Sequence, residues 1–587
     1  NTRTTSRLFG DVYAELKITK DLTFKTNFGI DIANVRNYNY GSSKQTTATG
    51  SGNGGNGYIK ELSRITENIL TYTKNWDEHR FSATGVYSWQ DYVYENLSIS
   101  GKGFQNDETG AWDMGLADRE TMSYASGKYG NTLISFTGRF TYAYKDRYLM
   151  TATARYDGSS RFGTNNKWGF FPSVGLGWRI SEETFLANNK VITNLKLRGS
   201  YGITGNQEIG NYKSLAQLKS KNYIYNDALM QGFYETIGNP DLKWERTKQF
   251  DLGFDLSLWN RIHLNVDYYS RRTSDLLYDV PIPSTSGFST MLSNIGIVSN
   301  KGVEIALSGR IVETKDFKLD ATVNISKNKN EIKELYNDVE SITVTSGLGL
   351  SKYLKVGESL LSIYGLKSEG IIKTEEQLAA YQKIVPTAQL GDEMYADIDD
   401  DKAITAKDQI NIGETEPNFF YGVALNLEYK KFHLDILGQG AHDFAAVGAS
   451  NSDMKIGIHG YGDSFNYLLV GENQTDNRCC LPSKYAYERM WSPSNPNGTF
   501  PRAGASNLYL SDRSNSGWNY FIIKSIALSY DFGNNPIKGI KGIKGISAFV
   551  NLQNFITFAN HRGYNPENGD TSNPWIKTIT IGVNAKF

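Results

Sequence analysis

The closing stretch of the chain, Trp575–Phe587, places an apolar residue at nearly every second position. A period of two predicts a β-strand with one apolar and one polar side. An uncovered strand edge is prone to aggregation, and closing the sheet into a barrel removes the edges altogether. Because the chain stops on an aromatic residue without a polar tail, we expect this strand to be paired within a closed barrel. The apolar series is Trp575, Ile579, Ile581, Val583, Ala585 and Phe587.

The same alternation recurs along the whole chain. In the stretch 249–258, Phe250, Leu252 and Phe254 share one face, and Asp251 and Asp255 lie on the other. A soluble sandwich strand also alternates, but carboxylates in its small core would be costly, whereas carboxylates that face a water-filled lumen are not. The pattern predicts an all-β fold, a transmembrane antiparallel β-barrel. The predicted strands cover residues 12–19, 22–33, 63–74, 81–94, 133–144, 147–157, 168–180, 194–204, 249–258, 262–272, 301–311, 317–328, 421–429, 432–440, 519–532, 546–558 and 575–587.

The connections between these strands alternate between short and long. Short polar turns such as Lys20-Asp21 and Lys145-Asp146 join the members of a pair. Connections of about 30 to 90 residues separate the pairs, and this asymmetry is typical of outer-membrane barrels, with the short turns periplasmic. We therefore expect long extracellular loops, above all at about 329–417 and 443–517. The glycine-rich stretch at 50–57 is expected to be a flexible loop tip.

Composition excludes several other classes of protein. Lys plus Arg (62) equals Asp plus Glu (62) among the 587 residues, so the charge balance gives no reason to expect a nucleic-acid partner. No apolar run approaches the ~18 residues of a membrane helix. A β-solenoid should repeat at a fixed period, and no such period is present.

The number of predicted strands, about 17, is odd, whereas single-chain bacterial barrels have even numbers. A plugged transporter of about 22 strands would place five of them upstream. The chain opens on Asn1 without an initiator Met or a signal peptide. We therefore expect residues 1–587 to be the C-terminal part of a longer barrel protein.

Several motifs, spread in order over most of the chain from about residue 130 onward, carry a resemblance to a known family. They include RYDGSSRFG at 155–163, WGFFPSVGLGWRISEE at 168–183, GNPDLKWE at 238–245, NIGIVSNKGVEIAL at 294–307 and VNLQNFITFANHRGYNPE at 550–567. The run closely resembles the SusC-like TonB-dependent transporters of Bacteroidota outer membranes. The resemblance implies an N-terminal plug, a TonB-box and a carboxypeptidase-like extension, none of which is present in this chain.

The resemblance also implies partners and a function. They are TonB, outer-membrane lipid, a SusD-like lipoprotein over the extracellular mouth and a dimer of transporter–lipoprotein pairs. The function is active import of a bulky nutrient, with an oligosaccharide as the first candidate and a peptide as the second. The alternative is a passive porin or scaffold barrel, which needs neither plug nor partner. An enzyme is not expected, because no catalytic constellation is apparent in the sequence.

One motif carries metal chemistry. Asp397, Asp399 and Asp401 take the first, third and fifth positions of an EF-hand-like loop, with Ala403 at the seventh and Asp408 at the twelfth. This spacing predicts a calcium ion (Ca²⁺) as a structural clamp. Lys402 occupies the position where the sharp turn favours Gly. The alternative interpretation is an acidic, solvated turn without metal.

The remaining candidates are weaker. Cys479 and Cys480 are adjacent, without further soft ligands at zinc spacing. They are interpreted as two thiols or as a vicinal disulfide. The six histidines are scattered and contain no HExxH motif. Trp112, Trp491 and Trp518 are interpreted first as aromatics of the membrane girdle and second as sugar-stacking residues.

Overall fold

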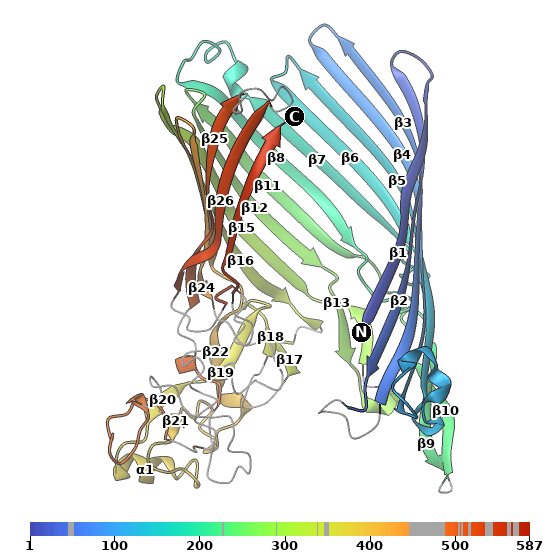
Figure 1. Cartoon of the computed structure of the whole chain (residues 1–587), viewed down its shortest axis with the longest axis vertical. Coiled ribbons are helices and arrows are strands. Elements are labelled where there is room, and N and C mark those ends of the chain that lie inside the picture. Colours follow the sequence, from blue (N-terminus) through green and yellow to red (C-terminus); the bar gives the residue numbers. More distant parts are fainter. Residues whose placement is uncertain are drawn as a thin grey trace. The chain divides into compact units, whose positions relative to one another are not determined.

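The computed structural model describes residues 1–44, 52–225, 228–288, 290–336, 339–345, 352–444, 488–502, 505, 509–514, 518–534, 544–559, 565–567 and 575–586. Seventeen strands belong to one large antiparallel sheet (Figure 1). They are β1 (Thr2–Lys17), β2 (Leu22–Gly41), β3 (Gly52–Trp76), β4 (His79–Phe104), β5 (Ser123–Tyr144), β6 (Tyr148–Ser159), β7 (Trp168–Arg179), β8 (Ile192–Asn206), β11 (Glu245–Leu258), β12 (Ile262–Ser274), β15 (Ile297–Glu313), β16 (Phe317–Glu334), β23 (Phe419–Tyr429), β24 (Phe432–Phe444), β25 (Trp518–Asn534), β26 (Gly545–Ala559) and β27 (Thr578–Lys586).

The remaining elements are short. Five antiparallel pairs form outside the large sheet, together with one α-helix and several 3-10 turns among the described residues. The pairs are β9 (Gln217–Tyr225) with β10 (Ala228–Thr236), β13 (Leu277–Pro281) with β14 (Thr290–Asn294), β17 (Ser341–Thr345) with β18 (Lys352–Lys355), β19 (Ser362–Leu366) with β22 (Gln409–Glu414), and β20 (Ser368–Ile371) with β21 (Glu393–Tyr395). The helix is α1 (Glu375–Tyr381), and the 3-10 turns are Gly110–Trp112, Met114–Leu116, Arg119–Thr121, Ile180–Glu182, Ser284–Ser286, Ala406–Asp408 and Asp512–Ser514.

Each predicted strand corresponds to one strand of the large sheet, but many strands are longer than predicted. The connection expected after Ala33 is much shorter, because β2 continues to Gly41 and β3 already begins at Gly52. The last predicted strand, 575–587, is too long. Strand β27 begins at Thr578, and Trp575 instead packs against a buried cluster around Tyr520. Phe587 lies outside the described residues.

The glycine-rich stretch was wrongly predicted as a loop tip. Residues 52–57 belong to β3 and pair with both neighbours, for example Gly54 with Tyr40 and with Gly101. A Cβ atom on Gly54 would lie 2.8 Å from the Cβ of Ala111 and 2.9 Å from the backbone oxygen of Asn39. Glycine is therefore needed here because the 110–112 turn packs directly on the strand. Positions 50 and 51 lie outside the described residues.

The short turns use backbone conformations that match the twist of a hairpin. Lys145 and Asp146 both have positive φ, 55° and 53°, and Trp259 and Asn260 have 52° and 53°. Two consecutive residues with positive φ are typical of type I′ turns, the preferred two-residue hairpin connection. These turns therefore fix the register of β5 with β6 and of β11 with β12.

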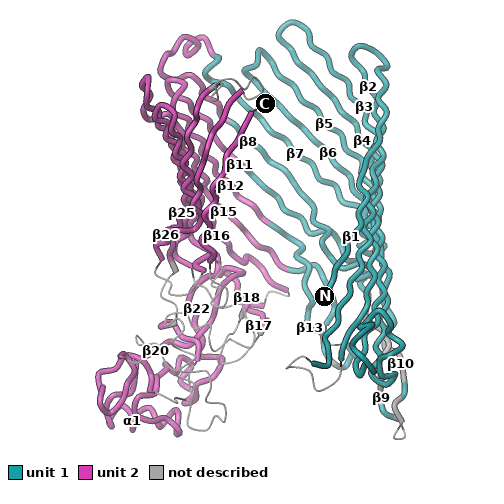
Figure 2. The backbone as a smooth tube through the Cα atoms, viewed as in Figure 1, with its two compact units in different colours: residues 1–182, 198–250, 273–295 teal, residues 183–197, 251–272, 296–587 magenta. Residues whose placement is uncertain are grey.

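The chain divides into two compact units (Figure 2). Unit 1 comprises residues 1–182, 198–250 and 273–295. Within it, β1 to β7 pair with one another in sequence order. Unit 2 comprises residues 183–197, 251–272 and 296–587. Within it, β15, β16 and β23 to β27 also pair in sequence order.

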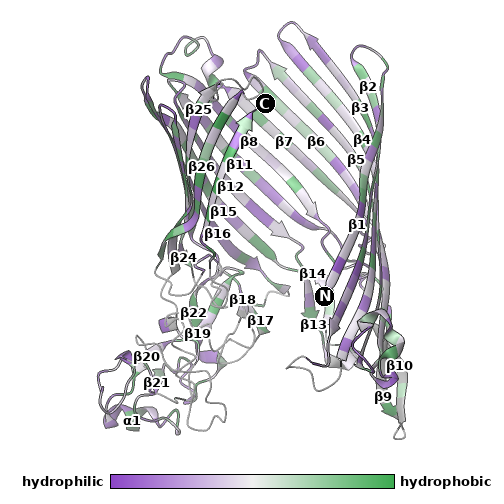
Figure 3. Ribbon diagram, viewed as in Figure 1, coloured by the Kyte–Doolittle hydropathy of each residue, from purple (hydrophilic) through white to green (hydrophobic). Residues whose placement is uncertain are grey.

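The sheet of unit 1 has two chemically different faces. Residues directly opposite each other on neighbouring strands share a face, and apolar and polar residues alternate along the strands (Figure 3). One row across β2 to β5 contains Phe28, Thr66, Trp89 and Ile134, and its side is called the apolar face. The adjacent row contains Asn27, Glu67, Ser88, Ser135 and, on β6, Asp157, and its side is called the polar face.

The apolar face of unit 1 is exposed rather than packed. Phe136 and Phe140, on this face of β5, are 49% and 54% exposed. Soluble proteins rarely leave such a contiguous apolar surface uncovered. The same holds within unit 2, where Ile305 on β15 lies opposite Ile325 on β16 and both are exposed. Among the described residues, no helix has the length and apolarity needed to cross a membrane.

Three of the motifs that carry the family resemblance, at 155–163, 168–183 and 238–245, contribute residues to one buried cluster in unit 1. Phe162 packs tilted against Trp244 at a ring-centroid distance of 4.8 Å, and Phe171 packs edge-to-face against the same ring at 5.2 Å. Trp244 donates its Nε1 hydrogen to the backbone oxygen of Lys167 at 3.0 Å, and Leu242 is fully buried beside it. Motifs that lie far apart in the sequence therefore share one packing role.

Candidate functional site

The candidate metal loop lies in the connection between β16 and β23, within unit 2. The described part of this connection folds around the pairs β19–β22 and β20–β21 and the helix α1. Helix α1 begins with a capping box, in which Thr374 and Gln377 each bind the other's backbone N–H. The helix packs Tyr381 against Ile372 and Ala388. This small core holds the long connection in a defined shape.

The connection between β24 and β25 packs onto the same core. Leu366 donates its N–H to the backbone oxygen of Leu510 at 2.7 Å, and Ser368 donates to Asp512 Oδ1 at 2.9 Å. Arg502 Nε lies 2.7 Å from the carboxylate of Asp392, which is almost completely buried. The two longest connections therefore form one joint structure, which we call the loop subdomain, consisting of the described residues of 355–414 and 488–514.

A buried acid lies at the centre of the loop subdomain. Glu393 is 2% exposed and accepts a hydrogen bond from Ser368 Oγ at 2.5 Å, and Arg513 lies 3.6 Å away. Burial raises the pKa of Glu393, since the charged form loses its hydration. Burial also raises the pKa of the neighbouring Tyr381 to about 12. The backbone N–H of Tyr395 donates to the Tyr381 hydroxyl at 3.0 Å, so the acid and the helix are linked.

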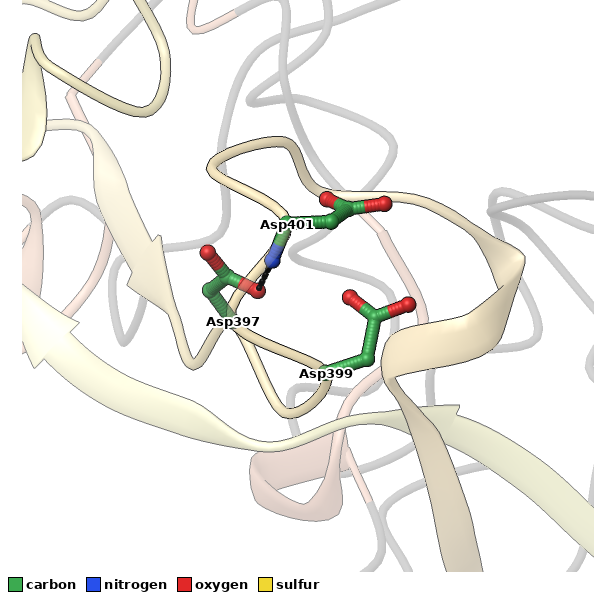
Figure 4. A group of neighbouring side chains, drawn as sticks. All are labelled: Asp397, Asp399 and Asp401. Atoms are coloured by element: carbon green, nitrogen blue, oxygen red, sulfur yellow. Dashed lines mark hydrogen bonds between the residues drawn. The ribbon is translucent and has the colours of Figure 1, made fainter.

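The acidic loop follows β21. Carboxylate oxygens of Asp397, Asp399 and Asp401 all lie within 4.8 Å of one another, and the three side chains surround one turn of the chain (Figure 4). Asp397 accepts the N–H groups of Asp401 at 3.2 Å and Lys402 at 2.8 Å. The sharp turn is made by Asp400 and Lys402, with positive φ of 57° and 65°. Lys402 thus adopts the conformation that glycine usually provides.

The last predicted ligand, Asp408, closes the loop by hydrogen bonds. It is completely buried, and its two oxygens accept the N–H groups of Ile398 and Thr405, each at 2.7 Å. Ala403 donates its N–H to Asp401 at 3.0 Å. The structure therefore brings three of the five predicted metal residues together, and Asp408 fastens the two ends of the same loop.

This arrangement offers hard oxygen ligands to a cation. Three carboxylates on a tight loop suit Ca²⁺, which binds through several oxygen atoms at flexible geometry. Lys407 Nζ lies 3.8 Å from Asp399, so part of the negative charge is balanced within the chain.

The other candidates from the sequence are spread over the chain. Cys479 and Cys480 lie outside the described residues. Trp112 is 58% exposed and stacks on Tyr38 at 4.4 Å. Trp491 is half-buried against Gly391, where a Cβ would lie 2.2 Å from its ring. The side chain of Trp518 is not among the described ones.

The histidines that the structure describes pair with different neighbours. His79 contacts Tyr142, His263 contacts Ser257, His433 lies near Glu428, and His442 contacts Tyr421. Among the described residues, no histidine joins a cluster of metal ligands. His459 and His561 lie outside the described residues.

Sequence reasoning missed the residues that join the two long connections. Asp392 and Arg502 are separated by 110 positions, and no local periodicity connects them. The clamp on the 105–122 connection was also missed. Asp107 accepts hydrogen bonds from Tyr40, Ser42 and Ser43, and these donors hold its pKa well below the ordinary value. The sequence contained no signal for either contact.

Comparisons with known proteins agree with this architecture. The family described as TonB dependent receptor-like, beta-barrel, matches residues 2–353. TonB-dependent receptor P3 of Formosa agariphila is 31% identical over 98% of this chain and 57% of its own length. TonB-dependent receptor SusC of Bacteroides thetaiotaomicron is 28% identical over 93% of this chain and 53% of its own length. The RagAB peptide importer in its "closed-closed" state has a TM-score of 0.82 at 25% identity, over 100% of this chain and 63% of that one.

Proposed function

Because the chain belongs to the TonB-dependent receptor-like β-barrel family, we propose that it forms the barrel wall of a transporter that actively imports a bulky nutrient. Its fold is that of the family's antiparallel barrel, and its location is the bacterial outer membrane. The chain spans little more than half the length of the curated relatives that it matches. The plug and the energy coupling of the complete protein are therefore part of the proposal.

The observation that carries this proposal is that the apolar side chains of the sheet are on its exposed face, the reverse of their arrangement in a soluble protein. Exposed apolar side chains such as Phe136 and Phe140 suit lipid. Glu67 lies on the other face, together with Asp157, which pairs with the exposed Arg155, and this face suits water. A barrel of about 22 strands encloses a wide lumen that has to be plugged, and a plugged barrel passes a bulky solute only when energy displaces the plug. TonB is the proposed source of that energy.

The loop subdomain supports the proposed partner. Two long connections share one core, with Tyr395 and Leu366 buried in it. In the proposed topology the short turns are periplasmic and the loop subdomain is extracellular. A defined extracellular structure at the mouth is suited to docking a SusD-like lipoprotein, and a dimer of transporter–lipoprotein pairs is proposed with it.

An oligosaccharide is proposed as the cargo, and a peptide is the second candidate. The peptide is favoured by the structural similarity to the RagAB peptide importer. The experiment is growth of a gene-deletion strain and its complemented parent on defined oligosaccharides and on defined peptides as sole carbon source. The proposal expects loss of growth on one of these nutrient classes, restored by the complete gene. Unchanged growth and uptake on both classes would contradict import, and uptake that persists without TonB would favour a passive porin.

We also propose that the loop with Asp397, Asp399 and Asp401 binds Ca²⁺ as a structural clamp. The convergence of the three carboxylates supports this assignment. Sites of this class in extracellular modules bind calcium at about 10⁻⁴–10⁻³ M. Weak binding would suffice outside the cell. The ion would brace the turn between β21 and β22 and take no part in chemistry.

A further inference from the structure

A groove of about 510 Å³ lies on the apolar face of unit 1, at the end of β1 to β4 that is remote from their short turns. One row of directly opposed residues, Thr4, Arg36, Tyr58 and Leu97, crosses it. The next positions on the same face, Ser6, Asn34 and Asn56, add polar walls.

The groove presents a cation beside exposed aromatic rings. The Arg36 guanidinium lies 4.7 Å from the ring centroid of Trp112, which stacks in turn on Tyr38. Among the described residues, no carboxylate forms an ion pair with Arg36. A guanidinium with free donors suits phosphate or carboxylate oxygens, and an exposed indole suits the face of a sugar ring.

The remaining walls provide neutral hydrogen-bonding groups. Tyr58 donates its hydroxyl to Asn34 Oδ1 at 2.9 Å, and Asn56 donates to the backbone oxygen of Ala111 at 2.5 Å. Asn56 Oδ1 has no hydrogen-bond partner in the described part of the chain. Amides, hydroxyls and an arginine next to an aromatic ring are the groups that recognise an anionic saccharide.

The position of the groove relative to lipid narrows the choice of ligand. Along β2, four residues separate Arg36 from Ile32, which lies in an apolar row with Leu8, Leu62 and Val93. Four residues span about 13 Å along a strand, or about 10 Å in height at the usual tilt of a barrel strand. The headgroup layer of a phospholipid bilayer is only about 5–8 Å thick on each side. A ligand that reaches from the groove to this apolar row therefore needs a headgroup larger than that of a phospholipid.

One charged row borders the groove on the side of the apolar row. In it Lys60 and Lys128 flank Glu95, with Lys128 Nζ 2.7 Å from its carboxylate, and Arg64 pairs with Asp91 beyond the apolar row. Lys60 and Lys128 leave a net positive charge in the row next to the groove. Such a row suits the phosphate groups near the surface of an anionic outer leaflet.

From this arrangement we propose that the groove binds the anionic saccharide headgroup of an outer-leaflet glycolipid, whose acyl chains lie on the apolar face below. The proposal goes beyond nutrient import and rests on the proposed topology, with the groove on the extracellular side. The groove lies on the face opposite Glu67 and Asp157, so a cargo that crosses the lumen would not meet it.

The test uses the complete native protein, extracted from outer membranes in mild detergent, with rough lipopolysaccharide of the host strain as the probe. Native mass spectrometry measures the lipid bound to wild type and to the double variant Arg36→Ala, Trp112→Ala. Loss of one charge-assisted contact weakens binding by about tenfold or more, so we expect at least that loss. Asn37→Ala is the matched control, because Asn37 neighbours Arg36 on the opposite face of the same strand, and it should bind like wild type.

A second arm uses the deacylated headgroup alone. Weaker binding of the free headgroup than of the intact lipid, with both sensitive to the double variant, is the expected result. Equal lipid binding by wild type and double variant would overturn the proposal, and so would a groove that binds only the free saccharide. Nutrient uptake by the double variant should equal that of wild type. Failure of lipid binding with intact uptake is thus distinguishable from failure of the import function.

Discussion

Arg502 donates its Nε hydrogen to Asp392 Oδ1 at 2.7 Å, joining two connections that lie 110 positions apart in the chain. The Asp392 side chain is only 4% exposed, and it also accepts the N–H of Gln389 at 2.9 Å. The backbone N–H of Arg502 donates to the oxygen of Gly391 at 2.7 Å, so side chain and backbone act together. This contact explains how two long connections form one loop subdomain.

The first prediction concerns this pair. Arg502→Ala leaves a buried carboxylate without its partner, and such a loss costs about 3–5 kcal/mol. Because Arg502 is partly exposed, we expect the lower end, about 3 kcal/mol. Hydrogen exchange of the amides at 389–395 measures the local opening. Lys355→Ala is the control, because Lys355 is exposed and its pair with Glu358, at 3.6 Å, contributes at most about 1 kcal/mol. Equal effects of the two substitutions would contradict this account.

The second prediction concerns pH. Burial, the largest cause, raises the pKa of Glu393 in the folded state, while Ser368 and Arg513 oppose the shift and Asp512 adds to it. The folded state therefore holds its proton more strongly than the unfolded state. The stabilisation that protonated Glu393 gives to the fold is therefore fully present at pH values below the ordinary pKa of 4.5. It is lost as the pH rises through the raised pKa of Glu393 in the folded state.

Local opening of residues 509–513 should therefore become easier as pH rises from about 4.5. Hydrogen exchange, corrected for its intrinsic pH dependence, measures this trend. Glu393→Gln removes the titrating group and should flatten the profile. A wild-type profile as flat as that of the variant would show that Glu393 does not control the contact.

The third prediction concerns the acidic loop. Asp399→Asn removes one of three convergent carboxylates, whereas Asp400→Asn makes the same charge change at the neighbouring position outside the cluster. Calcium titration of the complete protein after chelation should give binding at about 10⁻⁴–10⁻³ M for wild type. We expect binding to weaken about tenfold or more in Asp399→Asn, since one charged ligand is lost, and to be retained in Asp400→Asn. Absence of binding by wild type at millimolar calcium would support the acidic turn without metal.

The fourth prediction concerns the buried cluster of Phe162, Phe171 and Trp244 in unit 1. A Cβ on Gly163 would lie 2.0 Å from the backbone oxygen of Pro240, which has no side-chain freedom to move away. Gly163→Ala should therefore cost about 1–3 kcal/mol, as overpacking does. Gly138→Ala is the control, because nothing lies within 4 Å of its added methyl group. The temperature at which the barrel loses its folded mobility in gel electrophoresis should fall only for Gly163→Ala.

The fifth prediction tests which face of the sheet meets lipid. Phe140→Arg places a charge on the exposed apolar face, at a cost of up to about 2–4 kcal/mol at the bilayer midplane. Thr141→Arg places the same charge on the polar face of the same strand and should cost much less. The yield of folded protein in outer membranes compares the two. A larger loss for Thr141→Arg would reverse the assignment of the faces.

The strands were predictable because their chemistry is local. Alternation along residues 249–258 or 301–311 needs only neighbouring positions, and the structure has a strand of the large sheet at each predicted place. The ends of the strands were not predictable to the same degree. Residues 52–62 extend β3 and residues 95–104 extend β4, although glycines and polar residues interrupt the alternation there. The conformation of these residues depends on the packing of the 110–112 turn, which the alternation does not report.

The candidate metal loop was likewise predictable only where the signal is local. The spacing of Asp397, Asp399 and Asp401 predicted their convergence, because tight loops bring alternate residues together. The role of Asp408 in binding the N–H groups of Ile398 and Thr405 was not visible in the spacing. The core of the loop subdomain depends on contacts between distant segments, and a single sequence contains no periodicity that reports them.

The central claim is that import through this barrel is energised by TonB. The most direct measurement is accumulation of the labelled nutrient identified in the growth experiment, in cells with and without TonB, at equal amounts of the complete protein in the outer membrane. The account predicts accumulation above the external concentration with TonB and none without it. Equal accumulation in both strains would contradict active import and favour a passive barrel.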